Sequence, residues 1–196
     1  SSLLASLDED AIRRILNRVE EKTLNAADKG QLVRVIQNLR EKQPTQAEKY
    51  VAHFFSKLIA IGRQLEEKEQ PIRRFLDVCN KYLEGKKVVY DEQNYTLSIR
   101  RDRSNIPLEL RMLSSGEKQI VSLFSHLYLS GQSSYMIVID EPELSLAVPW
   151  QKQLLPDVLA SGHCDFLAAV THSPFIFANE LDSYSVNLRD CITGNR

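Results

Sequence analysis

The sequence predicts an α/β protein, in which helices flank a parallel sheet and a helical region precedes it. Two observations lead to this fold class. Apolar residues recur at helical spacing through residues 1–84, a segment also rich in charged residues. After Gly85, short apolar runs alternate with longer amphipathic segments, as strands and helices do around a parallel sheet. We therefore expect a helical insertion or arm region over 1–84 and an α/β part over 85–196.

The helical region divides at recognisable signals. Its first helix follows Ser6–Glu9, which has the spacing of a capping box. A second helix is expected from about Ala26 to Lys42, and a third follows Thr45, which can cap it. Pro71 either kinks this long helix or begins a new one, since proline is tolerated in a first turn. Sustained heptads are absent, so we expect no long coiled coil.

The α/β part begins with a predicted hairpin, whose strands are joined by a polar turn. A third short strand, an amphipathic helix and two apolar strands follow, with a further helix expected after each apolar strand, the second of them starting near Pro174, and then a last strand. The first apolar strand is uninterrupted, as expected for a central parallel strand that is buried on both faces. The hairpin strands, the third strand, the amphipathic helix and the two apolar strands are expected over 87–90, 95–99, 106–110, 117–130, 136–139 and 166–170.

Composition limits the class of protein. Hydrophobic residues make up 43% of the chain and charged residues 26%, which is typical of a globular domain. No apolar run approaches the ~20 residues of a membrane-spanning helix, and no signal peptide is visible. Cys79, Cys164 and Cys191 are widely spaced, so a structural zinc site is not expected. These features predict a cytoplasmic protein with free thiols.

The formal net charge of −1 favours neither a nucleic-acid partner nor an anionic membrane. A local basic cluster stands out against it: Arg100, Arg101 and Arg103, with Arg111 nearby. These side chains could contact a nucleic-acid backbone. The alternative, which the sequence alone favours, is a solvated hairpin turn.

Two carboxylates, Asp140 and Glu141, follow the apolar run 136–139 directly. Ionised acids at the end of a buried strand are costly unless they hold a cation or move a proton. One carboxylate near a magnesium ion and one near an attacking water would suit phosphoryl transfer. The alternative is that both acids are solvated and begin the next loop.

Two further segments have the residue types of a phosphate site. Ser114–Glu117 begins a helix with small residues and a glycine, which expose N–H groups at the positive end of the helix dipole. Serine is also a common helix cap, so this segment is weak support by itself. His172 follows the strand 166–170, on the same edge as the acidic pair, and could donate to a phosphate oxygen. A single histidine in a turn is more often structural or simply exposed.

Taken together, these segments resemble the ABC ATPase superfamily, and within it the RecF, SMC and OLD-like branch. The resemblance rests on LSSGEKQ at 113–119, MIVIDEPEL at 136–144 and VTHSP at 170–174, and it covers about Arg111 to Phe177. In its length and motif sequences the chain is also similar to ATPase subunits of bacterial anti-phage systems of the Septu and retron kind. The α/β part would then be the carboxy-terminal lobe of an ABC ATPase.

The resemblance implies a role for each motif. Asp140 would hold Mg²⁺, Glu141 would be the general base, and His172 would sense the γ-phosphate. The signature loop and Ser145 of the D-loop would contact ATP held mainly by a second subunit of a head-to-tail homodimer. The residues implied for these ATP contacts are Leu113, Ser114, Ser115, Gly116, Glu117 and Ser145.

The sequence departs from the family pattern at three positions. Ser115 and Glu117 replace the usual glycine and glutamine of the signature, and both are familiar in this branch. Ala147 stands where many relatives carry a polar residue in the D-loop, which puts a polar contact across the interface in doubt.

A complete ATP site also needs the glycine-rich loop G-x-x-x-x-G-K-[ST], which this sequence does not contain. Only Gly85 is followed by lysine, and Asn80 and Lys87 occupy the other diagnostic positions of that loop. In the family the loop belongs to an amino-terminal lobe, which would be a required partner. The chain alone is therefore expected to be inactive.

The function predicted from the sequence is ATP hydrolysis coupled to a nucleic-acid or anti-phage defence task. The alternative is a dimer that ATP locks, which scaffolds an effector such as a nuclease with little turnover. The sequence does not name the effector or the substrate.

Overall fold

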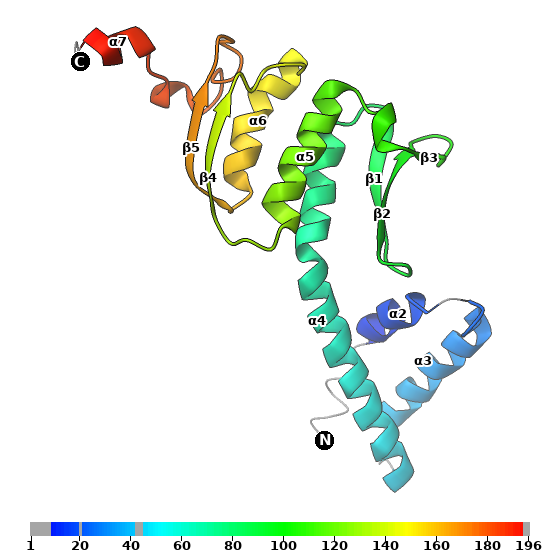
Figure 1. Ribbon diagram of the computed structural model, residues 1–196. Coiled ribbons are helices and arrows are strands. Elements are labelled where there is room, and N and C mark those ends of the chain that lie inside the picture. Colours follow the sequence, from blue (N-terminus) through cyan, green and yellow to red (C-terminus); the bar gives the residue numbers. More distant parts are fainter. Residues whose placement is uncertain (1–8, 20, 42–44, 194–196) are drawn as a thin grey trace. The chain divides into compact units, whose positions relative to one another are not determined.

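A computed structural model describes residues 9–19, 21–41 and 45–193. The predicted capping box at Ser6 begins outside this range. The chain divides into two compact units, one within Ser1–Gln70 and Tyr90–Thr96, the other within Pro71–Val89 and Leu97–Arg196. Figure 1 shows the order of the elements along the chain. In the described part of the chain, no helix is both long and apolar enough to cross a membrane.

The first unit is helical, as predicted. It contains α2 (Glu9–Asn17), α3 (Ala26–Glu41) and the first part of α4 (Gln46–Tyr82). α4 continues through Pro71, so of the two alternatives at this proline the structure excludes the start of a new helix. These helices meet through apolar residues at helical spacing, namely Ala11, Ile12, Leu16, Val33, Ala52, Phe55 and Ile59.

A buried carboxylate also ties the first unit together. Glu69 is 2% exposed and accepts two hydrogen bonds from the Arg18 guanidinium, at 2.8 and 2.7 Å. The Tyr90 hydroxyl donates to the same carboxylate at 3.0 Å. Such a bidentate pair offsets the cost of burying the charge.

The second unit contains the last part of α4 and most of the predicted hairpin, whose tip over Tyr90–Thr96 belongs to the first unit. β1 (Lys86–Asp91), β2 (Thr96–Arg101) and β3 (Pro107–Leu108) form a sheet in that order. β2 and β3 are antiparallel, with Ile99 opposite Leu108. The third strand is shorter than predicted, because the 3-10 helix η1 (Leu110–Met112) follows it almost at once.

The strands and helices that follow form the predicted parallel unit. They are α5 (Ser115–Leu129), β4 (Tyr135–Asp140), α6 (Val148–Ala160) and β5 (Cys164–Val170). The prediction of a helix from Pro174 and a strand after it is wrong, because the described residues after β5 form turns, then η2 (Asp182–Tyr184) and α7 (Leu188–Thr193). β4 and β5 are parallel neighbours. α6 lies along one face of their sheet (Figure 1). The core of this unit includes Tyr82, Ile120, Phe124, Leu154 and Val158.

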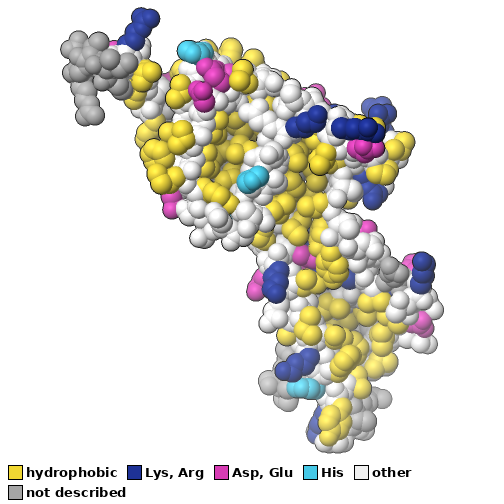
Figure 2. Space-filling view, in the orientation of Figure 1, with side chains coloured by type: hydrophobic (Ala, Val, Ile, Leu, Met, Phe, Trp, Pro, Cys, Tyr) yellow, Lys and Arg dark blue, Asp and Glu magenta, His cyan; other side chains and the backbone are white. Residues whose placement is uncertain are grey.

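The prediction that β4 is buried on both faces is wrong. Ile137 and Ile139 are partly buried, whereas Met136 is 77% exposed and Val138 is 74% exposed. Within the described residues, side chains pack against only one face of the sheet, and Figure 2 shows hydrophobic side chains at the surface over β4 and β5. A continuous apolar run thus marks a strand without showing how many of its faces this chain covers.

Candidate active site

The ends of β4 and β5 bring the acidic pair and the histidine to one edge of the sheet. Asp140 lies opposite Val170 in the parallel register, and the Glu141 N–H donates to the Val170 carbonyl oxygen at 2.8 Å. The two strands therefore end side by side. Glu141, the first residue after β4, and His172, the second after β5, enter the same loop region.

Glu141 and His172 are in direct contact. His172 Nε2 lies 3.2 Å from Glu141 Oε1, and the His172 and Glu141 side chains are 87% and 27% exposed respectively. Glu141 has φ 48°, a left-handed conformation that is uncommon for a residue with a side chain. Backbone strain of this kind costs about 1–3 kcal/mol and is often found at functional sites.

The environment of Glu141 raises the pKa of its carboxyl above the ordinary value. A hydrogen bond with the Glu143 carboxyl, followed by loss of hydration and the charges of Glu143 and Asp140, raises the pKa of Glu141, while His172 opposes this shift. A general base needs a pKa nearer to neutral than an ordinary carboxylate has. The direction of the shift therefore suits the role expected for Glu141.

Sequence reasoning gave no role to Glu143. Its carboxylate accepts hydrogen bonds from the Thr171 hydroxyl at 2.6 Å and from the backbone N–H groups of His172 and Ser173 at 2.9 and 3.0 Å. Although partial burial opposes ionisation, hydrogen bonds with the Thr171 hydroxyl, its own backbone N–H, the Glu141 carboxyl and the His172 N–H lower the pKa of Glu143 to about 2. Its place in the matched segment 136–144 is the sequence signal that could have drawn attention to it.

The signature loop forms a capped helix start. Ser114 Oγ accepts from the Glu117 N–H at 3.2 Å, and Glu117 Oε2 accepts from the Ser114 N–H at 2.7 Å, a reciprocal capping box. The Glu117 side chain also binds Lys86 Nζ of β1 at 2.6 Å. The Glu117 carboxylate is therefore bound to groups of the chain itself, Lys86 and the Ser114 N–H, whereas the Ser114 and Ser115 side chains are exposed.

Gly116 sets the distance between α5 and the loop after β4. A Cβ atom at this position would overlap the Ser145 carbonyl oxygen and lie 3.3 Å from Leu146 Cδ2. Gln119 Nε2 donates to the Pro142 carbonyl oxygen at 3.3 Å, so α5 contacts this loop twice. Ser145 is exposed and has φ 63°, while Leu113 is buried. The structure thus brings the predicted signature and D-loop residues together.

The chemistry of the acidic pair fits a magnesium ion. Asp140 is exposed at the strand end, and its carboxylate accepts no hydrogen bond from any residue that the structure describes. Mg²⁺ prefers oxygen ligands and keeps several waters, so one or two carboxylates suffice to bind it with a nucleotide. Among the described residues there is no group of three or more His, Cys, Asp or Glu side chains that could hold a metal, so water and the nucleotide would have to supply the other ligands.

A family comparison agrees with this geometry. Residues 6–178 match the family described as AAA domain, putative AbiEii toxin, Type IV TA system. The chain belongs to this AAA family. Membership supports a nucleotide-binding ATPase, and the match includes the helical region as well as the α/β part. Comparison with curated proteins gives no match.

Proposed function

We propose that this AAA domain supplies half of an ATP-hydrolysing site, which a second subunit and a phosphate-binding loop complete. The observation that carries the proposal is the contact of Glu141 with His172 at the end of two parallel strands. Asp140, the exposed residue directly before Glu141, would complete this group of side chains.

In the proposed reaction, Glu141 accepts a proton from water as the water oxygen bonds to the γ-phosphorus of ATP. The bond between that phosphorus and the bridging oxygen breaks, and ADP leaves with its electron pair. His172 donates a hydrogen bond to a γ-phosphate oxygen. Asp140 would hold Mg²⁺ through water, and the ion would neutralise charge on the phosphates.

The signature loop would serve the ATP of the other subunit in a head-to-tail homodimer. Ser114 and Ser115 are exposed at the start of α5, where the helix dipole favours an anion. Ser145 is exposed in the adjoining turn. Since Glu117 is bound to Lys86, we assign it to holding this loop in shape rather than to touching the nucleotide.

The test uses the whole protein with its phosphate-binding loop and compares the wild type with Glu141→Gln. Removing a general base should lower kcat by about 10²- to 10⁴-fold while KM for ATP changes little. Glu180→Gln, at an exposed glutamate outside the site, is the matched control. Unchanged turnover in Glu141→Gln would refute the proposal.

The same variant separates the ATPase from the ATP-locked scaffold. In Glu141→Gln, ATP should convert monomers to dimers, as measured by analytical ultracentrifugation, because bound ATP is no longer consumed. If ATP dimerises the wild type and the variant alike, and the slow turnover is the same in both, the scaffold is favoured instead.

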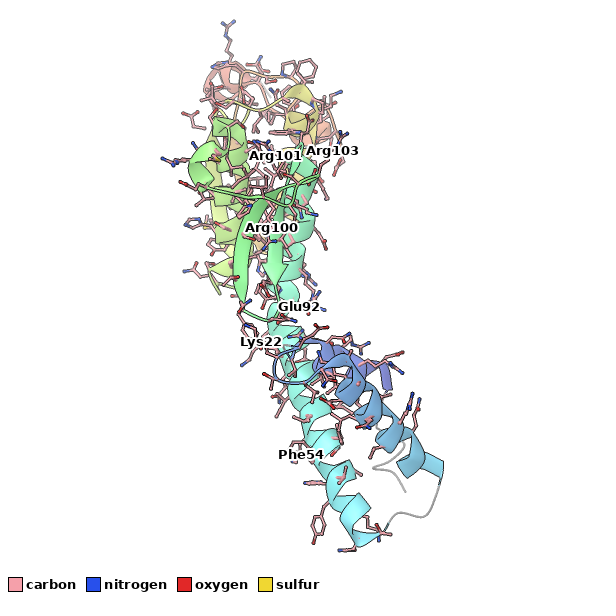
Figure 3. The ribbon with its side chains drawn as sticks, turned by 90° about the vertical axis from the view of Figure 1, so that its right-hand side faces the viewer. Lys22, Phe54, Glu92, Arg100, Arg101 and Arg103 are labelled. Carbon is pink, nitrogen blue, oxygen red and sulfur yellow. The ribbon has the colours of Figure 1, made fainter. Side chains whose placement is uncertain are left out.

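A nucleic-acid task is supported by the turn between β2 and β3. Arg101 and Arg103 are exposed, and neither guanidinium is bonded to another side chain in the described part of the chain. Backbone hydrogen bonds from Arg101 N–H to Ile106 O (3.0 Å) and from Asn105 N–H to Arg101 O (2.8 Å) hold the turn. Figure 3 shows Arg100, Arg101 and Arg103 on the same hairpin. A held turn with exposed arginines suits phosphate contacts.

Binding to labelled duplex DNA, measured by fluorescence anisotropy over a range of salt concentrations, tests this task. Arg101→Gln with Arg103→Gln should weaken binding and reduce the salt slope by about 0.9 for each phosphate that the protein no longer neutralises. The control of equal charge change is Arg63→Gln with Lys68→Gln, both exposed on α4. An unchanged slope would assign the cluster to a solvated turn.

The family's description as a putative toxin of a TA system also agrees with a defence task.

A further inference from the structure

Glu143 joins two loops that are far apart in sequence. Its Oε1 atom accepts from the backbone N–H groups of His172 (2.9 Å) and Ser173 (3.0 Å), and its Oε2 atom accepts from the Thr171 hydroxyl (2.6 Å). One carboxylate after β4 therefore fixes three successive residues after β5. Hydrogen bonds to an ionised carboxylate are stronger than those between neutral groups.

These bonds belong to a closed ring. The Ser173 hydroxyl donates to Gln151 Oε1 of α6 at 2.6 Å, and Gln151 Nε2 donates to the Leu146 carbonyl oxygen at 2.9 Å. The Leu146 N–H then donates to the Glu143 carbonyl oxygen at 2.9 Å, which returns the ring to its start. The ring encloses the turn that holds Ser145 in its left-handed conformation.

The His172 ring gains little support from packing. Its side chain is 87% exposed, and Glu141 is the partner of its Nε2 atom. The backbone sets where the His172 ring starts, and Glu143 holds this backbone through the N–H groups of His172 and Ser173, while the Thr171 hydroxyl bond holds the preceding residue. The ionised state of Glu143 is also favoured, since the same bonds lower its pKa.

We propose that Glu143 is the positioning residue of this site, which holds the His172 loop so that the imidazole lies against Glu141. Its role in turnover rests on the proposed ATPase function, whereas the positioning itself can be measured without ATP. The residue touches no reacting atom. It acts through the Thr171 hydroxyl and the backbone N–H groups of His172 and Ser173.

The test is a double-variant cycle read by NMR of the histidine rings. His172→Gln assigns the His172 signal among the four histidines of the chain. In the wild type, Glu141→Gln should shift this signal, because the ring loses its carboxylate partner. In Glu143→Ala, the same change should shift it by less than half as much, since the loop is no longer held. An equal shift in both backgrounds would overturn the proposal.

A second variant covers the case in which Glu143→Ala does not fold, and it also leaves the Glu141–Glu143 contact in place. Thr171→Val removes one of the three bonds to Glu143, and the coupling of His172 to Glu141 should fall. Glu143→Gln keeps a side-chain oxygen that can accept from the loop. Its coupling between His172 and Glu141 should therefore be stronger than that of Glu143→Ala. Full coupling in Thr171→Val would likewise refute the proposal. Glu180→Ala is the control that should leave the cycle unchanged.

Turnover in the whole protein gives the second readout. Glu143→Ala should lower kcat by about 10- to 100-fold with KM for ATP nearly constant, because small misplacements of catalytic groups cost up to about 10²-fold. If the wild type has no ATPase activity, the proposed function fails while the NMR cycle still decides the positioning role. If wild-type turnover is present and Glu143→Ala retains it, the positioning role is refuted instead.

Discussion

Glu117 shows how a residue of a functional motif can act through the fold. It is 5% exposed, and its carboxylate binds Lys86 at 2.6 Å as well as the Ser114 N–H at 2.7 Å. Removal of one member of a buried ion pair leaves an uncompensated charge. The Lys86–Glu117 pair therefore links β1 to the start of α5, and the shape of the signature loop depends on it.

We expect Lys86→Met to destabilise the protein by about 3 kcal/mol, the lower end of the range for breaking a buried pair, because the lysine is partly exposed. Urea unfolding at pH 7 measures this destabilisation, and Lys87→Met, at the exposed neighbouring position, is the control. A destabilisation no larger than that of the control would show that the pair contributes nothing.

The same pair gives a pH dependence with a definite sign. Burial opposes ionisation, but the bonds from Lys86 and Ser114 lower the pKa of Glu117 below its usual 4.5. The stabilisation is thus present above pH 4.5 and disappears as the pH falls through the lowered pKa of the folded state. The difference in unfolding free energy between wild type and Lys86→Met should shrink over that acid range.

At the scale of elements, α5 and the loop after β4 meet at Gly116 without room for a side chain. Gly116→Ala should destabilise the protein by about 1–3 kcal/mol, since the new methyl group would meet backbone atoms of Ser145 rather than a flexible side chain. Gly30→Ala in α3 is the matched control, because nothing lies within 4 Å of its Cβ position. That change should stabilise α3 by about 0.5–1 kcal/mol. Thermal unfolding compares the two, and equal effects would contradict the packing argument.

The helices and strands were largely predictable from the sequence, because the spacing of apolar residues along the chain follows which side of each element is buried. The hairpin, α5, β4 and β5 follow from alternating or continuous apolar residues. The exposed face of β4 was not predictable, since an apolar run does not say which part of a protein covers it. α4 continues through Pro71, which a local rule left open.

The candidate site was predictable only where a motif supplied the residue. Asp140, Glu141 and His172 follow from their places after two strands, and the parallel register brings them to one edge. Glu143 was missed because its role consists of contacts with residues 171–173, and such contacts depend on how the two loops pack. The burial of Glu117 was missed for the same reason, since its partner Lys86 lies in another strand.

At the scale of the whole molecule, the chain carries the groups that we propose act on a γ-phosphate, but its sequence lacks the loop that wraps the phosphates. Its sequence contains no G-x-x-x-x-G-K-[ST] segment, and without that segment's backbone N–H groups ATP has no main anchor. We therefore expect the 196-residue chain to release no phosphate from Mg·ATP above the level of its own Glu141→Gln variant. A malachite-green assay at millimolar ATP measures this. Turnover that depends on Glu141 would show that the residues present here bind ATP by themselves. Turnover that does not depend on Glu141 would point to a contaminating ATPase, because the proposed base would take no part in it.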